Sequence, residues 1–235
     1  MEKIDKRVSV EDALEVIHSY QSIMVGGFGV PGTPFTLLQA LAKKQLNQLT
    51  LIKNEANEAG MGISNLIEAK MATKLITSHL GLNSTVIKMM NNNEILVDFY
   101  PQGILAEKIR AGGAGLAGIL TDIGIDTILN KDKEIIMVNG KNAMVEKALR
   151  ADVALVHAAK ADRAGNLVYT KSARNFNPIM ATAADIVIAE AEEIVETGTI
   201  DPDRVHTPAA FVDLLVEINE ITREYEVLES HVIQK

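Results

Sequence analysis

The sequence predicts an α/β fold with an open, mostly parallel sheet and helices on both faces. Short apolar runs alternate along the chain with amphipathic segments, as in strand–helix–strand units. Two runs, DVALVHAA at 152–159 and DIVIAEA at 185–191, are almost continuously apolar, which is typical of parallel strands buried on both faces. No linker rich in proline, glycine or serine interrupts the chain, so we expect one domain over residues 1–235.

The first half of the chain is expected to follow this alternation. Ser9 with Asp12 three residues later resembles a capping box at a helix start, and SIMVGG at 22–27 is a short apolar strand. Thr33 is expected to cap the next helix, with Pro34 in its first turn. The elements expected next are strands at 49–53 and 74–80, a helix at 84–93, a strand at 95–103 and a helix at 104–115.

The second half contains the least regular segment, 111–133, which carries five glycines and is expected to be an ordered loop. A strand at 134–138 and a helix at 142–150 should precede the two apolar strands. The polar tail at 218–235 is expected to be a final helix or flexible. The positions expected in the core are Ile23, Val25, Leu38, Leu41, Leu51, Ile76, Leu96, Leu155 and Val187.

Composition excludes several classes of function. The formal net charge of −8 argues against a nucleic-acid partner, which needs clustered lysine and arginine. The absence of cysteine excludes disulfides, thiolate metal sites and a cysteine nucleophile. The five histidines lack the spacing of a helical metal motif, so no metal is expected. No apolar run approaches ~18 residues, and the N-terminus is unlike a signal peptide. We therefore expect a cytoplasmic protein without a membrane partner.

The glycine-rich turn GGFGVPG joins the predicted strand at 22–27 to the helix after it. Glycines let backbone approach a ligand closely, and free N–H groups at a helix start favour anions. The turn matches neither G-x-G-x-x-G nor a Walker loop. Gly26 and Gly27 could equally well only relieve crowding between strand and helix. The residues alone leave both interpretations open.

Three further groups of residues follow predicted strands, where open α/β sheets bind ligands. Gln102 could offer its amide to a substrate oxygen or bond a neighbouring loop. Glu55 and Glu58 could act as base or nucleophile, or be solvated. KSARNFNPIM at 171–180 is a contact with a ligand or with another protein chain, or a hydrogen-bonded structural loop. These local patterns do not decide between the alternatives.

Several blocks together resemble the alpha (A) subunit of family I CoA-transferases, of the 3-oxoacid and short-chain acyl type. The signature G-G-F-x-x-x-G-x-P is met by Gly26, Gly27, Phe28, Gly32 and Pro34. Further blocks follow in order: LTLI, SHLG, PQGILAEKIRAGGAG, ALRADVALV, ADRAGNLVY, ARNFNPIMATAAD and IVETGTIDPD. The resemblance covers about residues 9 to 217, and it implies a fold shared with some sugar-phosphate isomerases.

The resemblance also implies an activity. Such enzymes move CoA from an acyl-CoA to a free carboxylic acid by a ping-pong route through a glutamyl-CoA thioester, without a metal or tightly bound cofactor. The nucleophilic glutamate lies in a Ser-Glu-Asn-Gly motif of the beta (B) subunit, and this chain has no such motif. The chain should therefore be active only with a beta subunit, in a heterodimer or heterotetramer. CoA and a short-chain acid are the expected substrates.

The same resemblance assigns roles to residues of this chain. Gln102 would hold the reacting carboxylate or thioester oxygen, because an amide donor stabilises developing negative charge. Asn54 and Glu55 would lie near the acyl group. The residues expected to face CoA are Gly26, Gly27, Phe28, Gly29, Val30, Pro31 and Gly32.

The chain departs from the family in two places. The family loop Ser-Asn-Asn-Ala-Gly is here Lys-Asn-Glu-Ala-Asn at 53–57. The extra carboxylate of Glu55 would repel an anionic acid unless Lys53 or a substrate ammonium pairs with it, so we hypothesise that Glu55 shifts acyl specificity, toward a substrate with a positive group. An Asp-Gly pair of the family is replaced by Ser19 and Tyr20.

Two other functions are compatible with a fold of this type. One is a sugar-phosphate isomerase or deaminase, which would need its own acid and base within one chain. The other is a non-catalytic metabolite sensor. Activity of the isolated chain on a sugar phosphate would favour the first, and metabolite binding without a partner of the beta type would favour the second.

Overall fold

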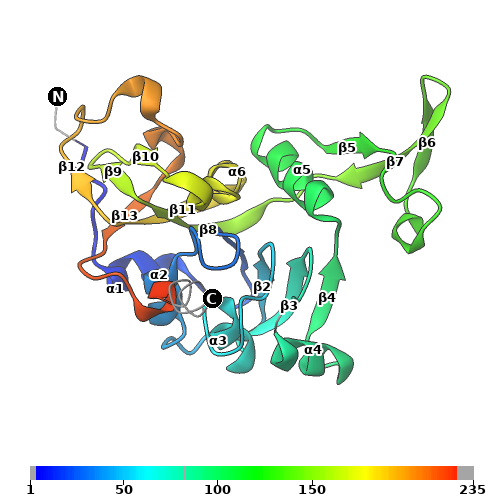
Figure 1. The fold of residues 1–235 in the computed structure, drawn as a ribbon, viewed down its shortest axis with the longest axis horizontal. Helices are drawn as coiled ribbons and strands as arrows, with labels where there is room; N and C mark the ends of the chain where they lie inside the picture. The colour runs from blue at the N-terminus through cyan, green and yellow to red at the C-terminus, as the bar shows by residue number, and fades with distance from the viewer. Residues whose placement is uncertain (1–3, 82, 227–235) are drawn as a thin grey trace, which may run out of the picture.

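A seven-stranded sheet forms the centre of the molecule in the computed structural model, which describes residues 4–81 and 83–226 (Figure 1). Its order is β13-β11-β8-β1-β2-β3-β4, and all six pairings are parallel. The predicted fold class is confirmed. The strands of this sheet are β1 (Ser22–Val25), β2 (Leu49–Ile52), β3 (Ala72–Thr77), β4 (Leu96–Phe99), β8 (Ala151–Ala158), β11 (Ala184–Ala191) and β13 (Leu214–Glu217).

Helices cover both faces of the sheet, α1 to α4 on one side and α5 and α6 on the other (Figure 1). A hydrophobic core lies on each face of the sheet. The strands contribute residues to both cores because successive side chains point to opposite faces. Ile23 and Val25 of β1 pack in the first core, whereas Met24 packs in the second. The helices are α1 (Val10–Ala13), α2 (Phe35–Leu41), α3 (Ile63–Glu68), α4 (Ser84–Asn91), α5 (Gln102–Gly113) and α6 (Asn177–Thr182).

Two smaller three-stranded sheets complete the described part of the chain. The first has the order β10-β9-β12, and the second has the order β5-β7-β6 and projects beyond α5 (Figure 1). Their strands are β5 (Gly118–Thr121), β6 (Ile135–Val138), β7 (Lys141–Lys147), β9 (Lys160–Asp162), β10 (Leu167–Val168) and β12 (Ile194–Val195). Short 3-10 helices lie at Leu14–Val16, Ile128–Asn130, Lys171–Arg174, Pro202–Arg204, Ala209–Phe211 and Arg223–Glu226.

The predicted helix caps have different outcomes. Ser9 caps α1, since its Oγ accepts from the backbone N of Asp12 at 3.0 Å, and that prediction is confirmed. Thr33 does not cap α2, because its hydroxyl donates instead to the Gly29 carbonyl at 2.8 Å. A free N–H group at the start of α2 is instead satisfied by Glu190 of β11, whose side chain accepts from the Leu37 backbone N at 2.9 Å.

The predicted helix at 142–150 is wrong, because this segment holds strand β7. Asn139 and Gly140 both have positive φ angles, of 51° and 75°, and form the two-residue turn of a β6–β7 hairpin, as Asn-Gly favours. The segment 111–133 is likewise not one loop. It contains the end of α5, strand β5 and the 3-10 helix at 128–130. The part of the 218–235 tail beyond residue 226 lies outside the described residues.

One predicted core position, Leu96, is wrong. It lies on edge strand β4 and its side chain is 59% exposed. The other eight predicted positions are all buried. Within residues 4–81 and 83–226, no helix is both long and apolar enough to cross a bilayer.

Tyr20 occupies a backbone conformation that suits glycine. Its φ is 73° and its side chain is 78% exposed, so a left-handed residue gains little packing to offset its strain. We expect Tyr20→Gly to raise the free energy of unfolding by up to about 1 kcal/mol. Urea denaturation measures the change. Tyr20→Ala is the matched control, since it removes the ring and keeps the strain; an equal gain in both variants would contradict this explanation.

Candidate functional site

The glycine-rich loop at 26–34 leaves the carboxyl end of β1 and turns sharply into α2. Gly27, Gly29 and Gly32 have φ angles of 98°, 61° and 74°, which L side chains rarely adopt. The Phe28 N donates to the Pro31 carbonyl at 3.1 Å and closes the tip of the loop. The tip is therefore a compact turn held by its own backbone.

The glycines at the base of this loop are tightly packed. A Cβ on Gly26 would lie 1.9 Å from Oδ1 of Asn177, and one on Gly32 would lie 2.4 Å from the Ala173 carbonyl oxygen. Asn177 holds the base in place, because its Nδ2 donates to the Gly32 carbonyl at 3.0 Å and its Oδ1 accepts from the His157 N at 3.1 Å. Gly26 and Gly32 thus form a tightly packed corner at the base of the loop, where a side chain would not fit, while the tip of the loop faces outward.

A cavity of about 650 Å³ opens beside the loop tip. It lies beyond the carboxyl ends of β1, β2 and β3, the edge at which open α/β sheets bind ligands. Its walls are largely apolar, and its described lining residues include no lysine or arginine. They are Phe28, Gly29, Val30, Pro31, Glu55, Asn57, Glu58, Met61, His79, Leu80, Gly81, Ser172 and Asn175.

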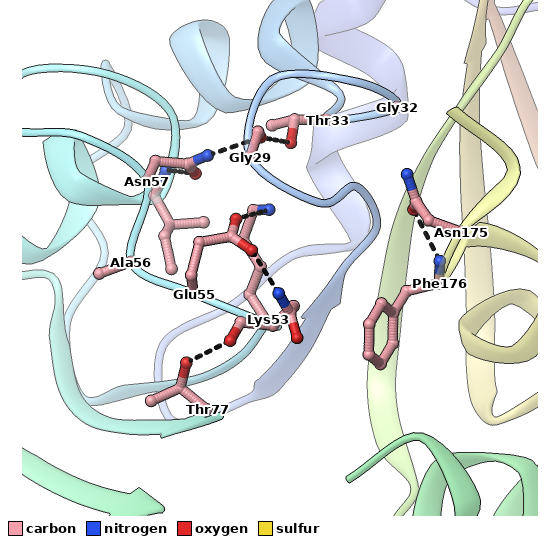
Figure 2. Close-up of polar contacts among 12 residues, drawn as sticks. Gly29, Gly32, Thr33, Lys53, Glu55, Ala56, Asn57, Thr77, Asn175 and Phe176 are labelled. Atoms are coloured by element: carbon pink, nitrogen blue, oxygen red, sulfur yellow. Dashed lines mark hydrogen bonds and ion pairs between the residues drawn. The ribbon is translucent and has the colours of Figure 1, made fainter. Parts of the chain in front are cut away.

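The second wall of the cavity is the 53–62 loop after β2. Asn57 ties it to the glycine-rich loop, since its Nδ2 donates to the Gly29 carbonyl at 3.0 Å (Figure 2). Asn57 has a φ of 58° and stands where the resembling family motif has glycine. Among residues with a side chain, asparagine is one of those that tolerate this conformation best, which explains why the substitution of glycine preserves the turn.

Glu55 has an internal partner in this wall (Figure 2). Its Oε1 lies 2.6 Å from Nζ of Lys53, whose side chain is fully buried. Burial lowers the pKa of Lys53, and the charge and hydrogen bond of Glu55 oppose that shift. Of the two possible partners of Glu55, the structure supplies Lys53, so no substrate ammonium is required to balance the carboxylate.

Asn54 and Gln102 lie next to this pair. The Nδ2 of Asn54 donates to Oε2 of Glu55 at 2.8 Å, and its Oδ1 accepts from Nε2 of Gln102 at 2.9 Å. Gln102 begins α5 and is exposed, so its amide has a second N–H and a carbonyl at the surface. Gln102 and Asn54 thus lie beside the cavity wall and not among its lining residues.

The predicted CoA-facing residues separate into two groups. Phe28, Gly29, Val30 and Pro31 line the cavity, whereas Gly26, Gly27 and Gly32 form the base of the loop. Sequence reasoning missed Met61 and Leu80 as wall residues, although each lies in a loop that follows a strand. Ser172 and Asn175 also line the cavity, and both belong to the 171–180 segment, for which the sequence left a ligand contact open. His79, which lies near the end of the strand predicted at 74–80, also lines the cavity.

A buried polar cluster around His157 underlies the glycine-rich loop, and the sequence did not predict its contacts. His157 Nδ1 lies 2.9 Å from Glu190 Oε1, and Nε2 lies 3.0 Å from Glu192 Oε1. The Tyr225 hydroxyl donates to the Thr33 carbonyl and lies 3.0 Å from His157 Nδ1. The available signal was a histidine and a glutamate within apolar strands, which the register of β8 and β11 places side by side.

The two carboxylates beside His157 favour the protonated form of its ring. Burial alone would lower the pKa of His157, but hydrogen bonds to Glu190 and Glu192 outweigh it and raise the pKa to about 9. Among residues 4–81 and 83–226, no three or more His, Asp or Glu side chains are arranged as a metal site requires. The absence of a metal stays a prediction.

Comparison with known proteins identifies the family. The family described as Coenzyme A transferase matches residues 7–218. This chain belongs to that family. The predicted resemblance and the predicted enzyme class are therefore confirmed, and the cavity lies within the matched residues.

Similar proteins carry related names. The chain is 42% identical over 215 residues to the alpha subunit of the acetate CoA-transferase of Escherichia coli K12, covering 92% of this chain and 98% of that protein. It is also 46% identical over 201 residues to the A subunit of a succinyl-CoA:3-ketoacid coenzyme A transferase of Xanthomonas campestris pv. campestris B100. That match covers 86% of this chain and 83% of that protein.

A solved structure shows the same fold in a longer chain. An acyl-CoA transferase from Escherichia coli O157:H7, in a thioester complex with CoA, matches with a TM-score of 0.83 and 23% identity. The match covers 94% of this chain and 48% of the other. The CoA-transferase chain described here thus spans about half the length of that transferase.

Proposed function

We propose that this chain is the alpha subunit of a heteromeric CoA-transferase, which moves CoA between a short-chain acyl-CoA and a free carboxylic or 3-oxo acid. The observation that carries the proposal is the cavity built from the glycine-rich loop, the 53–62 loop and the 78–81 turn. Two similar proteins are named for acetate and for succinyl-CoA and 3-ketoacids, and both names are those of subunits. These names support a short acyl group and a partner chain.

The walls of the cavity suit an acyl chain or the neutral arm of CoA. Val30, Pro31, Met61 and Leu80 supply apolar surface. The described lining residues offer no lysine or arginine for a phosphate group, which binds best to such side chains. This disfavours a sugar-phosphate isomerase, and it leaves the phosphates of CoA to be held outside this cavity or by the beta subunit.

The nucleophile is expected from the beta subunit. Glu55 is held in an ion pair with Lys53, and the chain has no Ser-Glu-Asn-Gly motif. In the proposed ping-pong route, the partner's glutamate takes the CoA sulfur as a thioester, and one of its carboxylate oxygens leaves with the free acid. The acceptor acid then takes the CoA from the glutamate by the reverse exchange, and an oxygen of the acceptor restores the glutamate carboxylate. Covalent catalysis of this type divides one difficult exchange into easier steps.

The chain's own residues position the reacting groups in this proposal. The loop tip at 28–31 faces CoA, and the corner at Gly26, Gly27 and Gly32 shapes it. Asn54 and Glu55 lie near the acyl group. The Gln102 amide donates to the carboxylate or thioester oxygen, where negative charge develops.

A thioester-exchange assay tests the proposal. Acetyl-CoA is mixed with acetoacetate, butyrate or an amino-substituted 3-oxo acid, in the presence of this chain, the beta subunit or the co-purified pair. We expect new acyl-CoA only with the pair. Exchange by this chain alone would contradict a split site, and a pair that forms without exchanging any acid would contradict the transferase activity.

Gln102→Ala is expected to lower kcat of the complex by about 100-fold, as for loss of one oxyanion donor. Its effect on the KM for acyl-CoA should be small, because the loop tip is untouched. Steady-state kinetics on the complex measure both. Gln39→Ala serves as control, since Gln39 lies on α2 and bonds Glu224; an equal fall in both variants would show that Gln102 has no special role.

Coenzyme A enters this proposal as a substrate, with no tightly bound cofactor. The cytoplasmic location stays a prediction from the sequence, as does the absence of nucleic-acid and membrane partners. The alpha and beta subunits form a heterodimer or a heterotetramer in this proposal, and the mass of the purified complex measures their stoichiometry.

A further inference from the structure

Lys53 is a fully buried cation directly after β2, next to the proposed acyl end of the site. A buried ammonium is costly unless it is paired and hydrogen-bonded. Its Nζ lies 2.6 Å from Oε1 of Glu55, whose side chain is also largely buried. The two charges therefore depend on each other, and neither side chain can change alone without leaving a charge behind the cavity wall.

The pair begins a chain of hydrogen bonds that ends at Gln102. The second oxygen of Glu55 accepts from Nδ2 of Asn54 at 2.8 Å. The Oδ1 of Asn54 then accepts from Nε2 of Gln102 at 2.9 Å. The Ser78 hydroxyl lies 3.0 Å from the same Oδ1 and 2.7 Å from the Asn54 backbone carbonyl, between which it shares its one proton. A carboxylate acceptor on one side and an amide donor on the other fix the orientation of the Asn54 amide.

We propose that Lys53 is a positioning residue of the transferase: it holds Glu55 in place, and through Glu55 and Asn54 it orients the Gln102 amide for the reacting acyl group. This inference rests on the proposed function and adds a residue that touches no substrate. Lys53 acts from behind the wall, since Glu55 lines the cavity and Lys53 does not.

The departures from the resembling motif support a coupled pair. That motif has serine at position 53 and asparagine at position 55, both neutral. Here both positions are charged with opposite sign, so the 53–57 motif gains no net charge. Either charge alone would leave an unpaired ion in a buried place, and the two changes compensate each other.

Kinetics of variant complexes with the beta subunit test the inference. Lys53→Met keeps the volume of the side chain and removes its charge. We expect kcat to fall about 10- to 100-fold, as for a displaced catalytic group, with the KM for acyl-CoA nearly unchanged. The double variant Lys53→Met with Glu55→Gln should recover most of kcat, because glutamine can still accept from Asn54 without a buried charge.

The recovery of kcat in the double variant separates positioning from simple filling of space. In the Lys53→Met complex, Glu55 loses the cation that pairs with it. The single and double variants both carry methionine at position 53, so they fill the same space and differ only in whether a buried carboxylate remains without its cation. Lys74→Met is the matched control, because Lys74 pairs with Asp98 at a partly exposed place on neighbouring strands.

The outcomes are distinct. Equal losses of kcat in the single and double variants, or a change in KM alone, would overturn the role of Lys53 while leaving the transferase intact. An inactive wild-type complex would overturn the proposed function itself. If Lys53→Met does not assemble with the beta subunit, Glu55→Gln alone decides: we expect a lower kcat with unchanged KM, and an unchanged kcat overturns the inference.

Discussion

Gly27→Ala is expected to lower the free energy of unfolding by about 3 kcal/mol or more, from left-handed strain and overlap together. Gly27 has a φ of 98°, and a Cβ there would lie 2.1 Å from Oγ1 and 2.6 Å from the backbone N of Thr33. Because Thr33 N is backbone, rotation of a side chain cannot relieve the overlap. The loop must move, and the cavity wall at 28–31 moves with it.

Urea denaturation and CoA binding to the complex measure this effect. Gly29→Ala is the matched control, since Gly29 has a φ of 61° but a Cβ there would meet no atom within 4 Å. It should lose only about 1 kcal/mol. Equal losses in the two variants would show that crowding at the base of the loop is not what makes Gly27 necessary.

His157→Ala is expected to destabilise the protein by about 3 to 5 kcal/mol, the usual effect of breaking a buried ion pair. It leaves Glu190, which is fully buried, without its cation. Glu190 also accepts from the Leu37 backbone N at the start of α2, so the loss reaches the helix that follows the glycine-rich loop. Glu192→Gln is the control, because the Glu192 side chain is 41% exposed; it should lose less than about 1 kcal/mol.

The same histidine should make stability depend on pH. Its pKa is about 9 in the folded protein against 6.5 as the ordinary value. Folding favours the protonated form, so this stabilisation is complete below pH 6.5 and is lost as pH rises through 9. The rise in pKa on folding corresponds to a contribution of about 3 kcal/mol to the free energy of unfolding. The stability gap between wild type and His157→Ala should narrow over that interval, and a constant gap would contradict the charged pair.

The parallel sheet could be predicted because its strands are apolar runs of the right length, separated by helical segments. Strand β7 could not be recognised by hydrophobicity alone, since Met144 and Glu146 are both buried on it. Glu146 lies in the ion pair with Lys108 of α5 at 2.8 Å, a contact across 38 residues. The turn at Asn139 and Gly140 was the local signal for the hairpin.

The site was only partly predictable for a similar reason. Loops after β1 and β2 could be placed at one edge of the sheet, because parallel strands share their direction. The separation of corner glycines from the cavity-facing tip depends on packing against Asn177, a residue about 150 positions away in the chain. The pairing of His157 with Glu190 depends on the register between β8 and β11, which a hydrophobic pattern does not determine.

The split site is the central claim, and trapping the covalent intermediate tests it most directly. The complex with the beta subunit is incubated with acyl-CoA in the absence of an acceptor acid, and the intact mass of each chain is then measured. We predict an added mass equal to CoA, less one water, on a glutamate of the partner chain and no addition to this chain. A CoA adduct on Glu55, Glu58 or any other residue of this chain would contradict the claim.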